Sequence, residues 1–305
     1  MGHYEIVDGV LLLNKPAGLT SNQALQRVRR MLRARKAGHT GSLDPAATGM
    51  LPLCFGEATK VCAFLLDADK TYRVTAQLGS ATETGDATGT EIEWAEVPDL
   101  SPDDWQKLLE SFLGETMQVP PMYSALKKDG KRLYELARKG KTIEREPRPI
   151  RIDEIELLES AGKRLVFRVR CSKGTYVRSL VEDIARKAGT VAHTARLHRE
   201  SVGAFRAADM LDMTGLEAAA KAGPEDLREQ LLPPDKALEG MPAIELDAES
   251  APKFLAGQKV SAPEGSPKGL ARVYGADTEF LGVGQLSKDN CLAPKRVFHA
   301  GEKNS

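Results

Sequence analysis

The segment from Gly38 to Met50 holds the residues of this chain that are best suited to chemistry. Its sequence is Gly-His-Thr-Gly-Ser-Leu-Asp-Pro-Ala-Ala-Thr-Gly-Met, with Asp44 near the centre. Three glycines and a proline without a clean period predict a loop. A carboxylate in such a loop can act as a nucleophile that adds covalently and later leaves. Aspartate is also common in turns and at helix N-caps, so the loop alone leaves a structural role open.

Two large classes of cofactor site have no pattern in this sequence. The chain has neither the G-x-x-x-x-G-K-[ST] phosphate-binding loop nor the G-x-G-x-x-G dinucleotide motif. The five histidines and four cysteines show no metal-ligand spacing, and His193 and His198 are five residues apart rather than the four of a helical pair. We therefore expect no metal and no nucleotide cofactor.

The elements around this loop alternate between strands and helices. Gly9–Leu13 is predicted to be a short buried strand that ends at Lys15-Pro16, and Thr20 or Ser21 should cap a helix after it. Residues 57–66 have a helical pattern. Thr71–Leu78 and residues 165–171 alternate as strands do, and a further helix should end near Gly189. This mixture predicts an α+β fold.

The charges are balanced in number but segregated along the chain. Lys and Arg total 43 and so do Asp and Glu, but the acids gather in residues 81–110 and 207–249. The bases gather in three sets: Arg27–Lys36; Lys127–Arg151; and Arg178, Arg186, Lys187, Arg196 and Arg199. A positive face of this kind can attract phosphates. A solvated basic surface is the alternative for any one set.

The length of the chain predicts about two domains, and its cysteine content predicts a reducing compartment. The acidic residues 207–249 include Pro233-Pro234 and are predicted to be a linker or a solvated helical segment, and residues 244–298 a small β-rich domain. The four cysteines form no disulfide pattern, and no signal peptide or membrane-length apolar run is seen. We expect a cytoplasmic protein.

Several stretches, in order along the chain, resemble the TruB family of tRNA pseudouridine synthases. They are GVLLLNKPAGLTS, GHTGSLDPAATGML, KTYRVTAQLG, PPMYSALKKDGKRLYELAR and CSKGTYVRSL, and the likeness covers most of residues 9–206. GLARVYG and EFLGVGQL resemble the PUA-like domain that follows the catalytic domain in many members. The chain is thus identified from its sequence as a member of this family.

The resemblance implies a fold and a domain division. It implies a mixed, mainly antiparallel central sheet with flanking helices, the pseudouridine synthase fold, in residues 1–240. An insertion at about residues 120–150 would clamp RNA. Residues 241–305 would form the PUA-like RNA-binding domain.

The implied reaction converts a uridine at position 55, in the T loop of tRNA, to pseudouridine. The uracil is detached from its ribose, turned and rejoined through carbon, so the isomerisation requires no redox cofactor, ATP or metal. The base must first leave its stack, at a cost of a few kcal/mol. The partner would be the tRNA T stem-loop, bound by a monomer without a guide RNA.

The resemblance also assigns roles to individual residues. Asp44 would be the nucleophile, Arg178 would pair with it, and Tyr72 would stack on the target base and assist proton transfer. The remaining roles go to residues that would contact RNA or support the site. Tyr176 and Leu197 would contact the flipped nucleotide, His39 would fill the gap left in the T loop, and Lys15 and Lys60 would be supports.

Two other functions remain open at this point. An RNA chaperone would use the basic sets and the aromatic residues without chemistry, but it would have no use for a carboxylate such as Asp44 in a phosphate-rich groove. A guide-RNA-dependent catalytic subunit would lack a segment comparable to residues 127–148.

Overall fold

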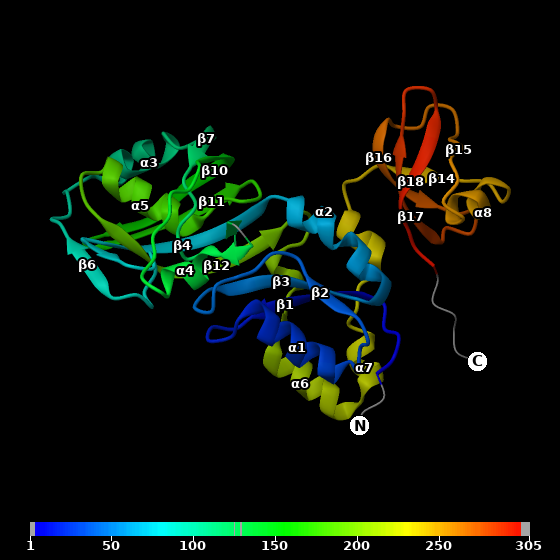
Figure 1. The fold of residues 1–305 in the computed structure, drawn as a ribbon, viewed down its shortest axis with the longest axis horizontal. Coiled ribbons are helices and arrows are strands. Elements are labelled where there is room, and N and C mark those ends of the chain that lie inside the picture. Colours follow the sequence, from blue (N-terminus) through cyan, green and yellow to red (C-terminus); the bar gives the residue numbers. More distant parts are fainter. Residues whose placement is uncertain (1–3, 125, 129, 300–305) are drawn as a thin grey trace.

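A nine-stranded mixed sheet is the frame of the protein in the computed structural model, which describes residues 4–299 apart from 125 and 129 (Figure 1). β2 (Ala37–His39) pairs with β3 beside the main path of the sheet. The other strands, in spatial order, are β13 (Leu211–Asp212), β1 (Gly9–Lys15), β3 (Thr48–Phe55), β12 (Ala192–Val202), β4 (Lys70–Leu78), β11 (Arg164–Cys171), β10 (Arg148–Ala161) and β7 (Gly114–Gln118). β1 with β13 and β3 with β12 are parallel pairs, and the other pairs are antiparallel. The predicted mainly antiparallel sheet is confirmed.

Helices cover the two halves of this sheet separately. α1 (Ser21–Met31), α6 (Met213–Ala222) and α7 (Pro224–Arg228) pack with β1 and β3 in one apolar cluster. α3 (Pro102–Glu110) and α5 (Val177–Lys187) pack with β4, β10 and β11 in another. Thr20 caps α1 as expected, because its hydroxyl accepts from Gln23 N at 3.1 Å while the Gln23 side chain accepts from Thr20 N.

The C-terminal part forms a separate small domain. Its five-stranded sheet has the order β14 (Ala243–Glu245), β16 (Gly269–Tyr274), β17 (Phe280–Leu286), β18 (Cys291–Val297) and β15 (Val260–Ser261), with α8 (Ser250–Leu255) beside it. The domain has an apolar core of its own. Val283 and Phe298 are not part of that core and belong instead to an apolar cluster that includes Leu12 and Met50 of the large sheet. Figure 1 shows this domain standing beyond α2 (Cys62–Asp67) at one end of the molecule.

Short elements complete the fold. They are η1 (Gly56–Val61), β5 (Ser80–Thr82), β6 (Glu91–Trp94), β8 (Lys127–Lys128), β9 (Lys131–Arg132), α4 (Leu133–Ala137), η2 (Ala207–Asp209) and η3 (Pro234–Leu238). Across the described part of the chain, no helix is both long enough and apolar enough to span a bilayer.

Three sequence predictions of local structure need correction. Residues 57–66 are a 3-10 turn followed by a short α-helix rather than one helix. The predicted loop from Gly38 to Gly49 begins inside β2 and ends inside β3, because both ends pair with neighbouring strands. Residues 207–249 are helical in part, as one of the two alternatives had it, but they are neither a linker nor fully solvated: β13 pairs with β1, and Leu216 and Leu227 are buried in the cluster that holds α1. Their acidic average concealed the apolar positions that face the core.

Candidate active site

The loop between β2 and β3 carries Asp44 and is tied to the start of α1. The buried Ser21 hydroxyl accepts a hydrogen bond from Leu43 N at 2.8 Å and donates one to Leu43 O at 3.1 Å. Beyond Asp44, Gly18 N donates to Pro45 O at 2.8 Å. The backbone is therefore held by hydrogen bonds on both sides of Asp44, at Leu43 and at Pro45, and the carboxylate has a defined position.

Arg178, in the first turn of α5, forms an ion pair with Asp44. Its Nε lies 3.0 Å from Asp44 Oδ2, and its side chain is 7% exposed whereas that of Asp44 is 43% exposed. The Nη1 and Nη2 atoms donate to Thr84 O and Tyr123 O, both at 2.7 Å. The guanidinium is thus held from three sides, while the carboxylate keeps a face open to a substrate.

The electrostatic environment of Asp44 contains opposing effects. Burial raises the pKa of this carboxyl above its ordinary value, and the nearby Asp86 carboxylate raises it further. Arg178 and Lys15 lower the pKa by favouring the charged form, but the net direction is upward. An ionised Asp44 is therefore stabilised by its cationic neighbours against the cost of its partly desolvated position.

Lys15, at the end of β1, lies beneath this loop and is fully buried. Its Nζ donates to Pro16 O at 2.9 Å, Leu19 O at 2.7 Å and Pro45 O at 3.3 Å. Burial lowers the pKa of Lys15 to about 8. The side chain joins the segment before α1 to the residue that follows Asp44, and it brings a positive charge toward the carboxylate.

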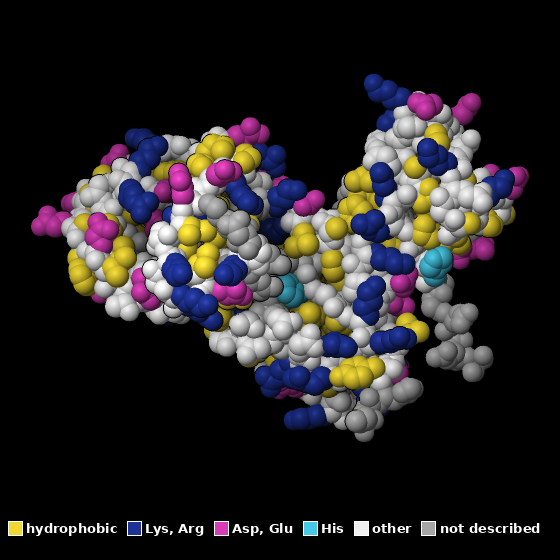
Figure 2. Space-filling view, in the orientation of Figure 1, with side chains coloured by type: hydrophobic (Ala, Val, Ile, Leu, Met, Phe, Trp, Pro, Cys, Tyr) yellow, Lys and Arg dark blue, Asp and Glu magenta, His cyan; other side chains and the backbone are white. Residues whose placement is uncertain are grey.

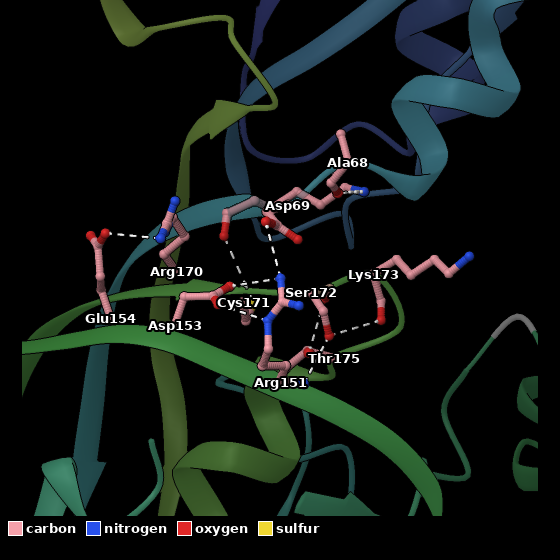
Figure 3. A network of polar contacts seen from close by, with 11 residues as sticks. Ala68, Asp69, Arg151, Asp153, Glu154, Arg170, Cys171, Ser172, Lys173 and Thr175 are labelled. Carbon is pink, nitrogen blue, oxygen red and sulfur yellow. Dashed lines mark hydrogen bonds and ion pairs between the residues drawn. The ribbon is translucent and has the colours of Figure 1, made fainter. Parts of the chain in front are cut away.

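A polar network fixes the turn that leads into α5 (Figure 3). Arg151 N donates to Ser172 Oγ at 2.8 Å, and Ser172 N donates back to Arg151 O at 2.9 Å. The Arg151 side chain reaches Asp153 Oδ1 at 2.7 Å, and Thr175 Oγ1 donates to Ser172 O at 3.0 Å. The turn is thereby anchored to β10, and the first residues of α5 are placed with it.

Tyr176 immediately precedes α5 and is held through its backbone. Gln118, at the end of β7, accepts from Tyr176 N at 2.8 Å and donates to Tyr176 O at 3.1 Å. The backbone of this half-buried tyrosine is therefore fixed two residues before Arg178.

Tyr72 and Leu197 line the sheet beside the ion pair. Tyr72 lies on β4 directly opposite Arg199 of β12, and Leu197 of β12 lies opposite Val74. Tyr72 and Leu197 pack on the same apolar cluster. Burial raises the pKa of Tyr72, and the Arg199 charge opposes that effect.

His39 and Lys60 occupy two different places. His39 is half-buried in β2, and among the described residues its Nδ1 atom has no hydrogen-bond partner. Burial and the Arg199 charge lower its pKa, which favours the neutral imidazole. Lys60 is held by Glu57 and by Val297 O at 2.7 Å, and its ammonium lies 5.5 Å from the centre of the Phe298 ring. The structure thus places Lys60 at the contact with the C-terminal domain, not beside Asp44.

Arg199 is a residue of the site that sequence reasoning missed. It was counted in a basic set that faces phosphates, but it is 1% exposed and donates to Met50 O at 2.6 Å and Gly41 O at 3.2 Å. The available signal was strand alternation, which places Arg199 on the same face as Leu197.

The surface outside the site is uneven in charge. Figure 2 shows Lys and Arg side chains in a band from the C-terminal domain past α2 toward α1, beside a hollow in the molecule. Exposed bases of these segments are Arg33, Arg35, Lys36, Lys295 and Arg296. In residues 4–299 as described, no three His, Cys, Asp or Glu side chains are grouped to hold a metal ion.

Comparison with known proteins covers nearly the whole chain. Residues 29–177 match the family described as TruB family pseudouridylate synthase (N terminal domain). Residues 178–239 match the tRNA pseudouridylate synthase B C-terminal domain, and residues 242–298 match pseudouridine synthase II TruB, C-terminal.

Curated relatives and solved structures give the same result. The chain is 50% identical to tRNA pseudouridine synthase B of Ectopseudomonas mendocina (strain ymp), over 97% of this chain and 96% of that one. It is 47% identical to tRNA pseudouridine synthase B of Nitrosococcus oceani, over 96% and 95%. The Cbf5-Nop10-Gar1 complex contains a similar chain, with a TM-score of 0.76 and 26% identity over 96% of this chain and 86% of that one.

Proposed function

The chain belongs to the TruB family and is a tRNA pseudouridine synthase, and from this we propose that it modifies uridine 55 in the T loop with Asp44 as nucleophile. The single observation that carries the choice of Asp44 is its ion pair with the buried Arg178, at 3.0 Å. A carboxylate that is oriented by a guanidinium and still partly exposed can add covalently to a substrate and leave again.

In the isomerisation one bond breaks, one bond forms and one proton is transferred. The bond between ribose and the base nitrogen breaks, a bond between the same ribose carbon and a base carbon forms, and that base carbon loses its proton while the nitrogen gains one. Tyr72 offers a ring for stacking on the base and a hydroxyl that can pass the proton. Its place on β4, opposite Arg199 and in the same apolar cluster as Leu43, supports both roles.

Contacts with the flipped nucleotide follow from the neighbouring side chains. Tyr176 would stack on it and Leu197 would form an apolar wall, which together offset the few kcal/mol lost when the base leaves its stack. His39 would enter the gap in the T loop as a neutral ring. Lys15 would support the loop through Pro45 O, whereas Lys60 would support the C-terminal domain through Val297 O.

The basic band supports recognition of the T stem-loop by this chain as a monomer without a guide RNA. Within the expected clamp, residues 120–150, the structure describes the β8–β9 pair and α4. The same segment contacts the site at Tyr123, whose carbonyl oxygen accepts a hydrogen bond from Arg178. The archaeal box H/ACA sRNP Nop10-Cbf5 complex contains a similar chain at 25% identity, but tRNA pseudouridine synthase B of Ectopseudomonas mendocina is far more similar in sequence, at 50%. The cytoplasm would be the site of action, since tRNA is the substrate.

The experiment that tests the nucleophile compares wild type with Asp44→Asn on an unmodified tRNA transcript. This nearly isosteric change removes the charge, and we expect tRNA binding without product. Product at the T-loop uridine from the variant would overturn the role of Asp44. Binding by both proteins without product from wild type would instead favour an RNA chaperone.

A further inference from the structure

Arg199 is a buried cation whose hydrogen-bond partners are backbone carbonyls. Arginine is seldom fully buried without a partner that compensates its charge. Here Nε donates to Met50 O at 2.6 Å and Nη2 donates to Gly41 O at 3.2 Å, and the side chain is 1% exposed. A carbonyl satisfies the donors but leaves the positive charge of the guanidinium largely uncompensated.

Gly41 and Met50 flank the loop that carries Asp44, so one guanidinium joins its two ends. The backbone of Arg199 also lies against this loop. A Cβ atom at Gly49, where φ is +100°, would come within 2.3 Å of Arg199 O. Both the side chain and the backbone of Arg199 therefore contact the loop at the point where it returns to the sheet.

The same side chain faces the reacting groups from the other direction. Arg199 is the cross-strand partner of Tyr72, and such partners have Cβ atoms about 4.5–5.5 Å apart. The guanidinium charge also acts on the Tyr72 hydroxyl, because it lowers the pKa of that group against the larger effect of burial. The other titratable groups near this pair are Lys15 on β1, His39 on β2, Asp44 in the loop, Lys70 on β4 and Cys171 on β11.

We infer that Arg199 is a positioning residue of the reaction: it clamps the two flanks of the Asp44 loop and places a fixed positive charge beside the Tyr72 hydroxyl. The inference deepens the proposed function and rests on it for the roles of Asp44 and Tyr72. The charge stabilises negative charge on the Tyr72 oxygen while the proton of the base carbon is in transit. The clamp keeps Asp44 in one place while the base turns.

The test uses Arg199→Met, Arg199→Lys and a control, Arg168→Met, in the full-length protein. Methionine removes the charge and both carbonyl bonds, whereas lysine keeps the charge but cannot reproduce the two-pronged contact. Arg168 lies on β11 with surface ion pairs to Glu156 and Glu200, so its removal deletes the same charge outside the site. Circular dichroism establishes that each variant is folded.

Two readouts separate positioning from a merely structural role. The first is the single-turnover rate of pseudouridine formation beside the Kd for tRNA. We expect Arg199→Met to lose at least about tenfold in rate, the equivalent of about 1.4 kcal/mol, with Kd within about threefold, and Arg199→Lys to recover part of the rate. The second is the NMR titration of His39, whose lowered pKa should rise in Arg199→Met and stay low in Arg199→Lys.

Wild-type rates in both Arg199 variants would overturn the clamp, and an unchanged His39 titration in Arg199→Met would overturn the fixed charge. If Arg199→Met does not fold, the test rests on Arg199→Lys. A wild-type rate in that variant would refute the clamp on the two carbonyls. A His39 pKa at its ordinary value in that variant would refute the proposed effect of a fixed positive charge at position 199. Asp44→Asn, assayed alongside, distinguishes the two hypotheses. Product from that variant would overturn the nucleophile whatever the Arg199 variants do.

Discussion

Replacing Ser21 by alanine tests whether the catalytic loop must be tied to the start of α1. The Ser21 hydroxyl accepts from Leu43 N at 2.8 Å and donates to Leu43 O at 3.1 Å, in a buried position. Alanine leaves both backbone groups of Leu43 without this partner, one residue before Asp44. The change therefore acts on the position of Asp44, the proposed nucleophile, and leaves its charge and its ion pair with Arg178 in place.

The expected size of the effect follows from the two lost hydrogen bonds. A buried backbone group left unsatisfied costs about 1–3 kcal/mol, and partial relaxation of the loop reduces the sum. We expect the free energy of unfolding to fall by about 2 kcal/mol, which corresponds to roughly 3 °C in Tm for a chain of 305 residues. If most of this cost appears as mobility of the loop, the single-turnover rate should fall by about tenfold, since 1.4 kcal/mol is one factor of ten.

Thr20→Ala is the matched control, because Thr20 is the adjacent residue and caps the same helix. Loss of the cap costs about 1 kcal/mol, but the Thr20 hydroxyl bonds within α1 and not to the catalytic loop. Thermal unfolding and single-turnover assays on both variants separate the two effects. Equal rates in Ser21→Ala and Thr20→Ala, at whatever stability, would refute the claim that this tether positions Asp44.

Two further predictions concern pH and the C-terminal domain. Because burial raises the pKa of Asp44, the single-turnover rate should fall on the acid side at a higher pH than an ordinary aspartate would give. Lys15→Met should move that fall to still higher pH, since the Lys15 charge lowers this pKa; a move in the other direction would contradict the assignment. Deletion of residues after 240 should weaken tRNA binding in filter assays, with turnover still detectable, and lower Tm by removing Val283 and Phe298 from the apolar cluster that they share with the large sheet. Equal tRNA binding would assign the domain another role.

The sequence predicted the parts of this fold whose signals are local. Alternation located β4 and β11, and the Thr20 cap located the start of α1, because period and capping act within a few residues. Composition misled for residues 207–249, where eleven acids hid Leu216 and Leu227 in the core. An average over a segment cannot show which face of a helix the charged residues occupy.

The candidate site was predictable only in part for a related reason. The resemblance, not the residue pattern, brought Asp44 and Arg178 together from distant parts of the chain. The tethers of Ser21 to Leu43 and of Arg199 to Gly41 end on backbone atoms, which every residue type presents. The residue type at the accepting position therefore cannot predict such a hydrogen bond, and the contact is seen only in the folded structure.

The use of carbonyls as partners also explains how a chain of zero net charge can present a positive site to RNA. Lys15 and Lys70 each donate to three carbonyl oxygens, and Arg199 donates to two. A carbonyl dipole satisfies a donor without cancelling a full charge, whereas a carboxylate would cancel it. Among these buried cations, the Lys15 charge lowers the pKa of Asp44, and the Arg199 charge lowers the pKa of Tyr72 and of His39. Arg168 and the half-buried Arg228 are instead paired with glutamates, which cancel much of their charge. The balance of 43 basic and 43 acidic residues therefore describes the whole chain, whereas the field at the site also depends on which hydrogen-bond partners its cations have.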